Sequence, residues 1–355
     1  MSARRFVAVL AALVAGCAAP TTQRVAVSDA ATRAEAERQR EIAAQTWVEE
    51  QKRLSRLHRM LATRASGLCG SDLGPSHGAF TMKRPGGEMG DAFSRHYGVS
   101  EVLTVLFVLE GSPAERAGLR PRDLVVKVNG VPTSDAEALR ELNDKLAPEA
   151  PIDLELRRDG APLALRVLPE KACRYPAIVT EEPVINAFAD GQRVMIARGM
   201  MSFARDDTEL ALVLAHEMAH NAMKHMDARR QNMGLGLLAD IAAAILSRGQ
   251  VGTNFAQIGA MAYSQEFEAE ADYVGLYILA AAGLPIEGAP HFWRRMAAAH
   301  PASIRSNHAA SHPSTAYRMV ALEETVKEIR DKQAKGLPLA PNLKDGKPSA
   351  PAKRE

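Results

Sequence analysis

The sequence predicts an α+β protein of several domains, with a helical N-terminal segment, a β-rich middle and a mostly helical C-terminal half that holds a small sheet. Three observations support this. Apolar residues recur at helical spacing among the charged residues of 18–66. Residues 76–172 alternate strand-like runs with turn residues, and 173–330 carry long helical runs. A chain of 355 residues, 46% of them hydrophobic, can bury more than one core.

In the N-terminal segment, Trp47, Leu54, Leu57 and Leu61 fall at helical spacing in an otherwise charged stretch. We expect a helical stalk, within 17–75, that spaces the body of the protein from a membrane. A short coiled coil that binds a partner is the alternative.

The most informative feature of the C-terminal half is the motif His216-Glu217-Met218-Ala219-His220. Residues four apart share one helix face, so both imidazoles can reach one metal ion, and Glu217 turns toward its open side. Two surface histidines would be the alternative, but the preceding run, 210–215, is apolar. Buried polar groups need a partner, and a catalytic zinc with one further ligand provides it.

The helix that carries this motif has a clear start signal. Asp206 followed by Glu209, or Thr208 as the cap, predicts the helix start, and the apolar run extends it to about Met226. The motif therefore lies in the middle of a rigid element.

The third ligand is expected from the predicted helix at 265–280. Glu266, Glu268 and Glu270 compete for this role. Glu268 and Asp272 share a face, so Glu268 could bind the metal while Asp272 accepts a hydrogen bond from a ligand imidazole. A solvated acidic face is the alternative.

The two motifs together, H-E-x-x-H and E-x-x-A-D at 268–272, resemble those of the HtpX and CAAX-prenyl-protease family of zinc metallopeptidases (gluzincins), and in particular its periplasmic lipoprotein branch with a PDZ domain. Residues 186–199 and 311–318 resemble further segments of that family, as does the position of His225. The resemblance implies one Zn²⁺ per chain, with Glu268 as its third ligand and Asp272 as the hydrogen-bond partner of a ligand imidazole.

The chemistry implied is hydrolysis of internal peptide bonds. Zinc lowers the pKa of a bound water to about 7, and Glu217 would take its proton and pass it to the leaving amine. By resemblance, His312 would stabilise the oxyanion, with a plain surface residue as the alternative. Arg318 would help to hold the loop of His312, and His225 is expected to be structural rather than a ligand. The strand near 193–197 is a candidate sheet edge for an extended substrate.

The first residues predict where in the cell the protein is located. Residues 1–16 have the charged start, apolar core and small residues of a signal peptide. Val14-Ala-Gly-Cys17 resembles the bacterial lipobox, which implies a lipid on Cys17; an ordinary secretory signal is the alternative. Because Ala18 is not the Asp that often signals inner-membrane retention, we expect a periplasmic protein anchored to the outer membrane.

The cysteine count agrees with that compartment, and the charge balance bears on which partners the protein can bind. With Cys17 lipidated, Cys69 and Cys173 remain as an even pair, and they are a candidate disulfide or else two free buried thiols. The chain has 44 basic and 42 acidic residues. Without Arg4 and Arg5 the two signs balance, so nucleic-acid binding is not supported.

The middle of the chain resembles the PDZ domains of bacterial envelope proteases, through the run from Gly111-Ser-Pro-Ala to Val128-Asn-Gly130. This implies a groove that binds a peptide or a C-terminus by strand addition, with Tyr97-Gly98-Val99 as the candidate carboxylate-binding loop. A PDZ-like fold used only as a spacer is the alternative.

The expected layout is a signal peptide (1–16), a helical stalk (17–75), a PDZ-like domain (76–172), a zinc metallopeptidase domain (173–330) and a disordered tail (331–355). Residues 233–247 are apolar, too short to span a membrane, and predicted as a buried helix or one at the mouth of the active site.

We therefore expect a zinc endopeptidase that acts on unfolded or misassembled envelope proteins in quality control. One alternative is a peptide-binding or chaperone-like lipoprotein whose metal site is structural or held closed. The other is a peptidase-like scaffold without metal.

Overall fold

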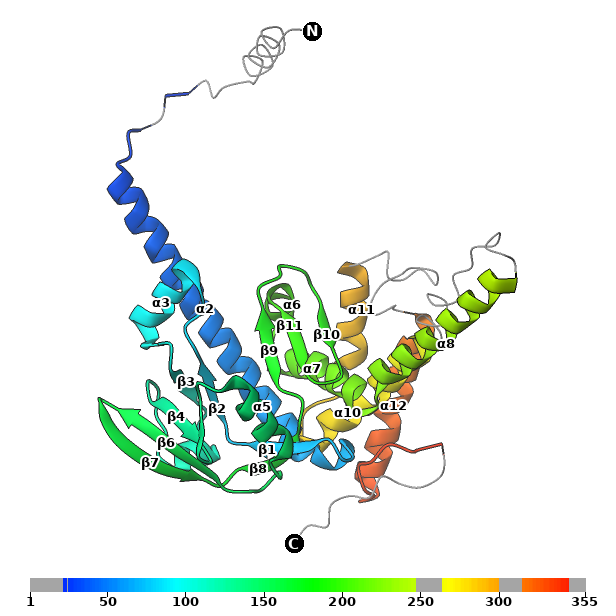
Figure 1. The fold of residues 1–355 in the computed structure, drawn as a ribbon. Coiled ribbons are helices and arrows are strands. Elements are labelled where there is room, and N and C mark those ends of the chain that lie inside the picture. The colour runs from blue at the N-terminus through cyan, green and yellow to red at the C-terminus, as the bar shows by residue number, and fades with distance from the viewer. Residues whose placement is uncertain (1–21, 24, 247–263, 300–314, 345–355) are drawn as a thin grey trace.

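The computed structural model describes residues 22–23, 25–246, 264–299 and 315–344 (Figure 1). Two predicted functional residues, Cys17 and His312, lie outside the described residues, as does the predicted signal peptide. The prediction of a disordered tail from 331 is wrong for residues 331–344, because helix α12 (Ala316–Ala334) extends past 331 and Ala340 is buried.

The N-terminal helix α2 (Asp29–Arg64) is one continuous rod of 36 residues, which begins where the Ser28 side chain accepts a hydrogen bond from the backbone N–H of Ala31. None of its residues from 29 to 43 is buried. From Ala44 onward the helix is packed into the protein, which differs from the predicted stalk. The buried residues are Ala44, Val48, Gln51, Leu54, Leu57, Leu61 and Ala62. Helix α2 is therefore part of the core.

Helix α2 packs against both halves of the molecule. Ala44 and Val48 join one cluster with the PDZ-like region, and Leu54 with its neighbours joins the large cluster of the C-terminal half. Trp47 contacts both: its ring packs edge-on against Phe80 and Phe93, and its indole N–H donates to the carbonyl of Val179 at 3.3 Å. The two halves are thus held on one rigid element.

The PDZ-like region is a sheet with strands in the order β2-β3-β4-β6-β7 and a short strand β5 paired to β4. The strands are β2 (Ala79–Met82), β3 (Leu103–Val108), β4 (Leu124–Val128), β5 (Val131–Pro132), β6 (Ile152–Arg158) and β7 (Ala161–Val167), and the helices are α3 (Gly87–Tyr97), α4 (Pro113–Arg116) and α5 (Ala136–Lys145). Asn129 and Gly130 both have positive φ, 47° and 80°, as a two-residue hairpin turn between β4 and β5 requires.

A cavity of about 220 Å³ opens between the edge strand β2 and helix α5. Its walls are apolar and include Ala79 on β2 and Leu139, Leu142 and Leu146 on or just after α5. The interpretation of Tyr97-Gly98-Val99 as the carboxylate-binding loop is wrong for this cavity. Gly98 is instead the left-handed end of α3, with φ 71°, and Val99 is buried in the cluster that faces α2.

The PDZ-like region is joined to the rest at both of its ends. Strand β1 (Leu73–Ser76) pairs with β8 (Glu170–Cys173), and Cys69 is bonded to Cys173, with the two Cα atoms 5.6 Å apart. The predicted disulfide is confirmed. It closes the chain around the whole PDZ-like region beside the C-terminal end of α2.

The small sheet of the C-terminal half has the order β10-β11-β9, from β9 (Ala177–Thr180), β10 (Ala187–Ala189) and β11 (Val194–Ala197). The prediction that 193–197 forms a sheet edge is wrong, because β11 is the central strand. Gln51 of α2 closes the β9 side: its amide donates to the carbonyl of Ala177 and accepts from the N–H of Val179. Strand β10 is the other end of the sheet and packs against α7.

The described helices of this half are α6 (Arg198–Phe203), α7 (Asp207–Ala222), α8 (His225–Leu246), α10 (Ser264–Ala281), α11 (Ala289–Ala299) and α12. Every residue of α7 from Leu210 to Asn221 is buried, and α10 packs along it. No helix among the described residues is both long and apolar enough to span a membrane.

Helix α8 projects from the body (Figure 1), so the prediction of a buried helix at 233–247 is wrong for its described part. Its large apolar side chains are at least 47% exposed: Met233, Leu235, Leu237, Leu238 and Ile241. The apolar run is read correctly as a helix, but its neighbours do not cover it.

Removal of the disulfide should lower stability. A cross-link between residues 104 apart in sequence removes chain entropy from the unfolded state, worth up to about 4.7 kcal/mol in the chain-entropy model. We expect a Cys69→Ala, Cys173→Ala variant to unfold at lower urea concentration than the oxidised wild type. Equal midpoints for the two proteins would contradict this role.

Candidate metal centre

Helix α7 starts at a defined cap. The Asp206 carboxylate accepts the N–H of Glu209 at 2.9 Å, and the Glu209 carboxylate accepts the N–H of Arg205 at 2.7 Å. Asp206, rather than Thr208, is therefore the cap. The helix ends at Ala222, four residues before the predicted end, and the H-E-x-x-H motif lies in its buried second half.

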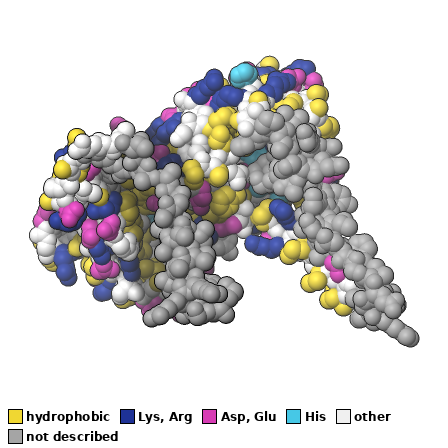
Figure 2. Space-filling view, turned by 90° about the horizontal axis from the view of Figure 1, so that it is seen from above, with side chains coloured by type: hydrophobic (Ala, Val, Ile, Leu, Met, Phe, Trp, Pro, Cys, Tyr) yellow, Lys and Arg dark blue, Asp and Glu magenta, His cyan; other side chains and the backbone are white. Residues whose placement is uncertain are grey.

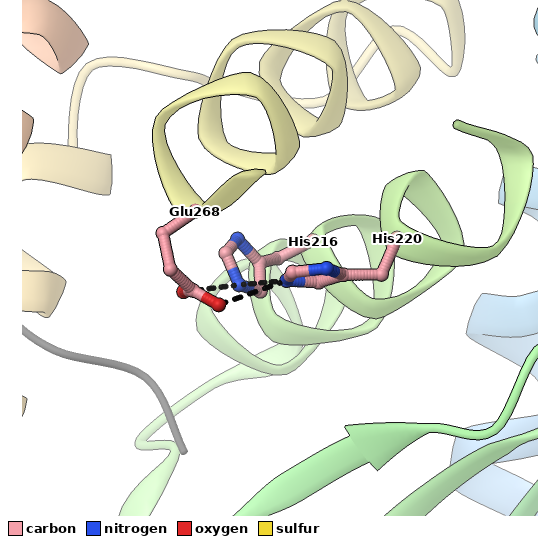
Figure 3. A group of neighbouring side chains, drawn as sticks. All are labelled: His216, His220 and Glu268. Carbon is pink, nitrogen blue, oxygen red and sulfur yellow. Dashed lines mark hydrogen bonds and ion pairs between the residues drawn. The ribbon is translucent and has the colours of Figure 1, made fainter. Parts of the chain in front are cut away.

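The three predicted ligands lie together (Figure 3). The Nε2 atoms of His216 and His220 are 3.2 Å apart, and the Glu268 carboxylate oxygens lie 3.4 Å and 3.3 Å from them. All three side chains are at most 5% exposed. Two ligands bound tetrahedrally at the usual zinc distances are about 3.3 Å apart, so this spacing fits zinc.

A close helix contact sets this geometry. Gly275 of α10 faces the backbone of His216 on α7, and a Cβ at Gly275 would lie 3.2 Å from the His216 Cα and N atoms. Two helices can approach this closely only where one of them has no side chain. The contact places Glu268 and Asp272, which precede Gly275 on α10, above the histidines.

Asp272 lies where the sequence placed it, beside a ligand imidazole. Its Oδ1 is 3.1 Å from Nδ1 of His216. Arg318, however, does more than the sequence indicated. It is 1% exposed, and its guanidinium binds both oxygens of Asp272, at 2.7 and 2.9 Å, and lies 3.0 Å from Glu268. Arg318 therefore orients the third ligand and the partner of the first.

The site carries an excess of buried negative charge. Burial tends to lower the pKa of His216, but the hydrogen bonds and charges of Asp272 and Glu268 outweigh it and raise that pKa to about 10. Burial tends to raise the pKa of Asp272, but Arg318 and His216 hold it below its usual range. Among the described residues, three carboxylates, counting Glu217, thus face one guanidinium, and a divalent cation bound to neutral histidines would compensate the difference.

His220 is suited to bind a metal as a neutral ligand. Its pKa is lowered, first by burial and then by the nearby charge of His216, against the raising effects of Glu268 and Glu217. His225, which the sequence predicted as structural, contacts His220 on the side away from Glu268: the two Nδ1 atoms are 3.0 Å apart. Among the described residues it is not one of the group that could hold an ion.

Glu217 is 2% exposed and its charge acts on both His220 and Arg318. It therefore lies next to the same site, as required of a base. The predicted oxyanion donor, His312, lies outside the described residues, so its position relative to Glu217 is not described.

Trp293 on α11 is a site residue that the sequence did not predict. This residue is 3% exposed, its ring centroid is 4.9 Å from that of His216, and the Arg318 guanidinium lies 5.4 Å from its ring centroid. It forms an apolar wall that packs two side chains of the site. One of only two tryptophans in the chain, it could have been noticed in the apolar pattern of 289–297, but nothing in the spacing connects it to the motif.

Helix α7 also holds the small sheet in place. Asn221 follows His220 and is fully buried; its amide donates to the carbonyl of Arg193 and accepts from the N–H of Gly191. These bonds tie the β10–β11 turn to the end of the motif. The sheet therefore has a defined position beside the metal centre.

Comparison with known proteins agrees with this site. Residues 154–326 match the family described as Peptidase family M48, and residues 104–158 match the PDZ domain. The first residues of the M48 match lie in strands β6 and β7 of the PDZ-like sheet. The C-terminal half is therefore similar to metallopeptidases of family M48, and the middle of the chain is similar to PDZ domains. The narrower resemblance to the HtpX and CAAX-prenyl-protease branch stays a prediction.

Two relatives illustrate the match. The mitochondrial metalloendopeptidase OMA1 of Schizosaccharomyces pombe is 31% identical over 160 residues, which cover 44% of this chain and 48% of the relative. The beta-barrel assembly-enhancing protease of Yersinia pestis is 29% identical over 127 residues, 32% of this chain and 26% of the relative. The chain thus matches less than half of the length of these relatives.

Among solved structures, the PDZ domain of HtrA3 bound to a phage-derived ligand is 29% identical, and the match covers 28% of this chain and 88% of that domain with a TM-score of 0.23.

Zinc affinity should rise with pH. With its pKa raised to about 10, His216 of the metal-free site keeps a proton at neutral pH, and zinc must displace that proton. At lower pH this proton competes more strongly with zinc, and at higher pH it is lost. We expect the zinc Kd to fall by about tenfold per pH unit between about pH 7 and pH 9. Chelator competition in a buffer series measures it, and a flat profile would contradict it.

The close helix contact can be tested at Gly275. In Gly275→Val the added side chain meets the His216 backbone, so we expect a loss of about 1–3 kcal/mol in the free energy of unfolding and weaker zinc binding. Gly234→Val on exposed helix α8 is the matched control, because a Cβ there meets nothing within 4 Å. Denaturant unfolding and zinc titration compare the two variants, and equal effects would argue against the contact.

Proposed function

We propose that this protein is a zinc-dependent endopeptidase that hydrolyses internal peptide bonds of unfolded or misassembled envelope proteins. The observation that carries the proposal is the buried group of His216, His220 and Glu268, whose three ligand atoms lie within 4.8 Å of one another beside Glu217. The M48 match and the protease relatives support the same class.

The residues of the site have distinct roles in this proposal. His216, His220 and Glu268 would hold the zinc ion, which would act as a Lewis acid and lower the pKa of water. Glu217 accepts the proton of the attacking water and passes it to the leaving amine. Asp272 and Arg318 keep His216 and Glu268 oriented, and burial excludes other water. His312 is proposed, from the resemblance alone, as the donor to the oxyanion.

An extended substrate can be positioned by backbone pairing. Strand β11 is central and the β9 side is closed by Gln51, so we place the substrate at β10, the strand that packs against the zinc helix. This replaces the edge predicted near 193–197. An internal peptide bond of a chain paired there would lie along α7.

The PDZ groove would gather substrates. The apolar cavity between β2 and α5 fits a hydrophobic side chain of a peptide or of a free C-terminus, and β2 is an edge strand of the PDZ-like sheet. Because α2 and the disulfide hold this region on the peptidase half, the groove would keep a fixed distance from the zinc site. The proposed setting is the periplasm, with a lipid on Cys17 and the outer membrane favoured.

The alternative function is a peptide-binding or chaperone-like lipoprotein whose metal site is structural or held closed. The apolar PDZ cavity and the buried metal ligands are compatible with this alternative. Turnover distinguishes the two: the alternative predicts binding of unfolded chains without cleavage.

The Glu217→Gln variant tests the enzyme directly. It keeps all three ligands but has no carboxylate to accept a proton, so we expect one zinc per chain and a loss of unfolded-casein cleavage of at least about a hundredfold. The matched control is Glu266→Gln, which removes an exposed carboxylate from α10.

Retained cleavage in Glu217→Gln would contradict the assigned role of this residue. Absence of cleavage by zinc-loaded wild type, with casein still bound, would favour the chaperone-like alternative. A chelator should abolish the wild-type activity, and added zinc should restore it.

A further inference from the structure

The two histidines of the metal site have different partners at Nδ1. His216 has Asp272 at its Nδ1. The Nδ1 of His220 instead faces a second imidazole, the Nδ1 of His225, at 3.0 Å. The other nitrogen of His225, Nε2, lies 2.9 Å from the Glu270 carboxylate. Glu270, His225 and His220 therefore form a continuous hydrogen-bonded chain that ends at the metal centre.

The chain defines where each proton sits. An ionised Glu270 can only accept, so Nε2 of His225 carries a hydrogen. A neutral His225 then has its lone pair on Nδ1, and His220 must donate from its own Nδ1. This leaves the lone pair of His220 on Nε2, the atom that faces Glu268 at 3.3 Å. The opposite tautomer would place a hydrogen where the metal must bind.

The break between α7 and α8 makes this contact possible. On a continuous helix, a residue five positions after His220 would point well away from it, because each residue turns the helix by about 100°. Here α7 ends at Ala222, Lys224 adopts a positive φ of 59°, and α8 begins at His225. The turn brings the His225 ring back to His220, with centroids 4.9 Å apart.

The ring of His225 is held from its other side as well. It stacks on Phe267 of α10 with centroids 4.7 Å apart and an angle of 22°, and the side chain is 2% exposed. Glu270, in contrast, is 49% exposed. His225 is therefore fixed by packing, while the exposed Glu270 carboxylate can be replaced without disturbing the core.

We propose that Glu270 and His225 are positioning residues that hold His220 in the tautomer and orientation needed to bind a divalent metal through Nε2. The inference rests on the proposed zinc site. It assigns to Glu270, which the sequence offered only as a competitor for the third ligand, and to His225 a role that acts through His220. The two ligand histidines are then fixed by different means, His216 by Asp272 directly and His220 by a carboxylate acting through an imidazole.

Zinc affinity, measured by competition with a chelator at fixed pH, tests the proposal without using proteolysis. We expect Glu270→Gln to raise the zinc Kd about tenfold and His225→Phe, which keeps an aromatic ring against Phe267, to raise it about ten- to a hundredfold. Glu266→Gln, on the same helix, should leave the Kd unchanged. Denaturant unfolding of the zinc-free proteins corrects for any loss of folding.

The double variant is the decisive arm. If Glu270 acts only through His225, then Glu270→Gln should have no further effect in the His225→Phe background. An unchanged Kd in Glu270→Gln, or its full effect in the absence of His225, would overturn the proposal.

A spectroscopic measurement gives an independent readout. Nitrogen-15 spectra of zinc-loaded protein labelled at histidine should show His220 with its hydrogen on Nδ1, and Glu270→Gln should broaden or shift that signal. A wild type that binds no zinc would defeat the proposed function itself. Equal affinity in all variants would defeat only this inference.

Discussion

The close packing of α10 on α7 is the constraint on which the rest of the site depends. Because Gly275 has no side chain, the α10 backbone can approach that of His216, and the preceding turns of α10 then overlie the motif. Glu268 meets both imidazoles, Asp272 reaches His216, and Glu270 reaches His225 from this one helix. The contact between α7 and α10 thus positions the ligand Glu268 and the Asp272 partner of His216. It also positions Glu270, which holds His225 beside His220.

Electrostatics explains why so polar a group can be buried. Glu217, Glu268 and Asp272 are each at most 4% exposed, and Arg318 is the guanidinium that contacts two of them. A buried charge without compensation is costly, and among the described residues these three carboxylates face one Arg. The raised pKa of His216 reflects the same deficit of positive charge. Zinc would supply the missing charge, so metal binding and the stability of this core are expected to be coupled.

Helix α2 turns two domains into one arrangement. It closes the β9 side of the small sheet with Gln51, packs its Trp47 against the PDZ-like region, and ends next to the disulfide that bounds this region. The small sheet is in turn tied to the zinc helix by Asn221. The PDZ cavity, the small sheet and the candidate metal centre are therefore connected through a few buried contacts.

Local pattern by itself determined helices α7 and α10 and the PDZ-like strands, because helical spacing, turn residues and capping act within a few residues. The cysteine pair was predicted instead from the even number of cysteines left in an oxidising compartment. Local pattern could not decide that α2 is packed, that β11 is central or that α8 is exposed, because burial depends on which distant segments pack against an element. Arg318, Trp293 and the link from Glu270 through His225 are likewise tertiary: they join segments distant in sequence. Only the folded chain decides which polar groups share one buried space.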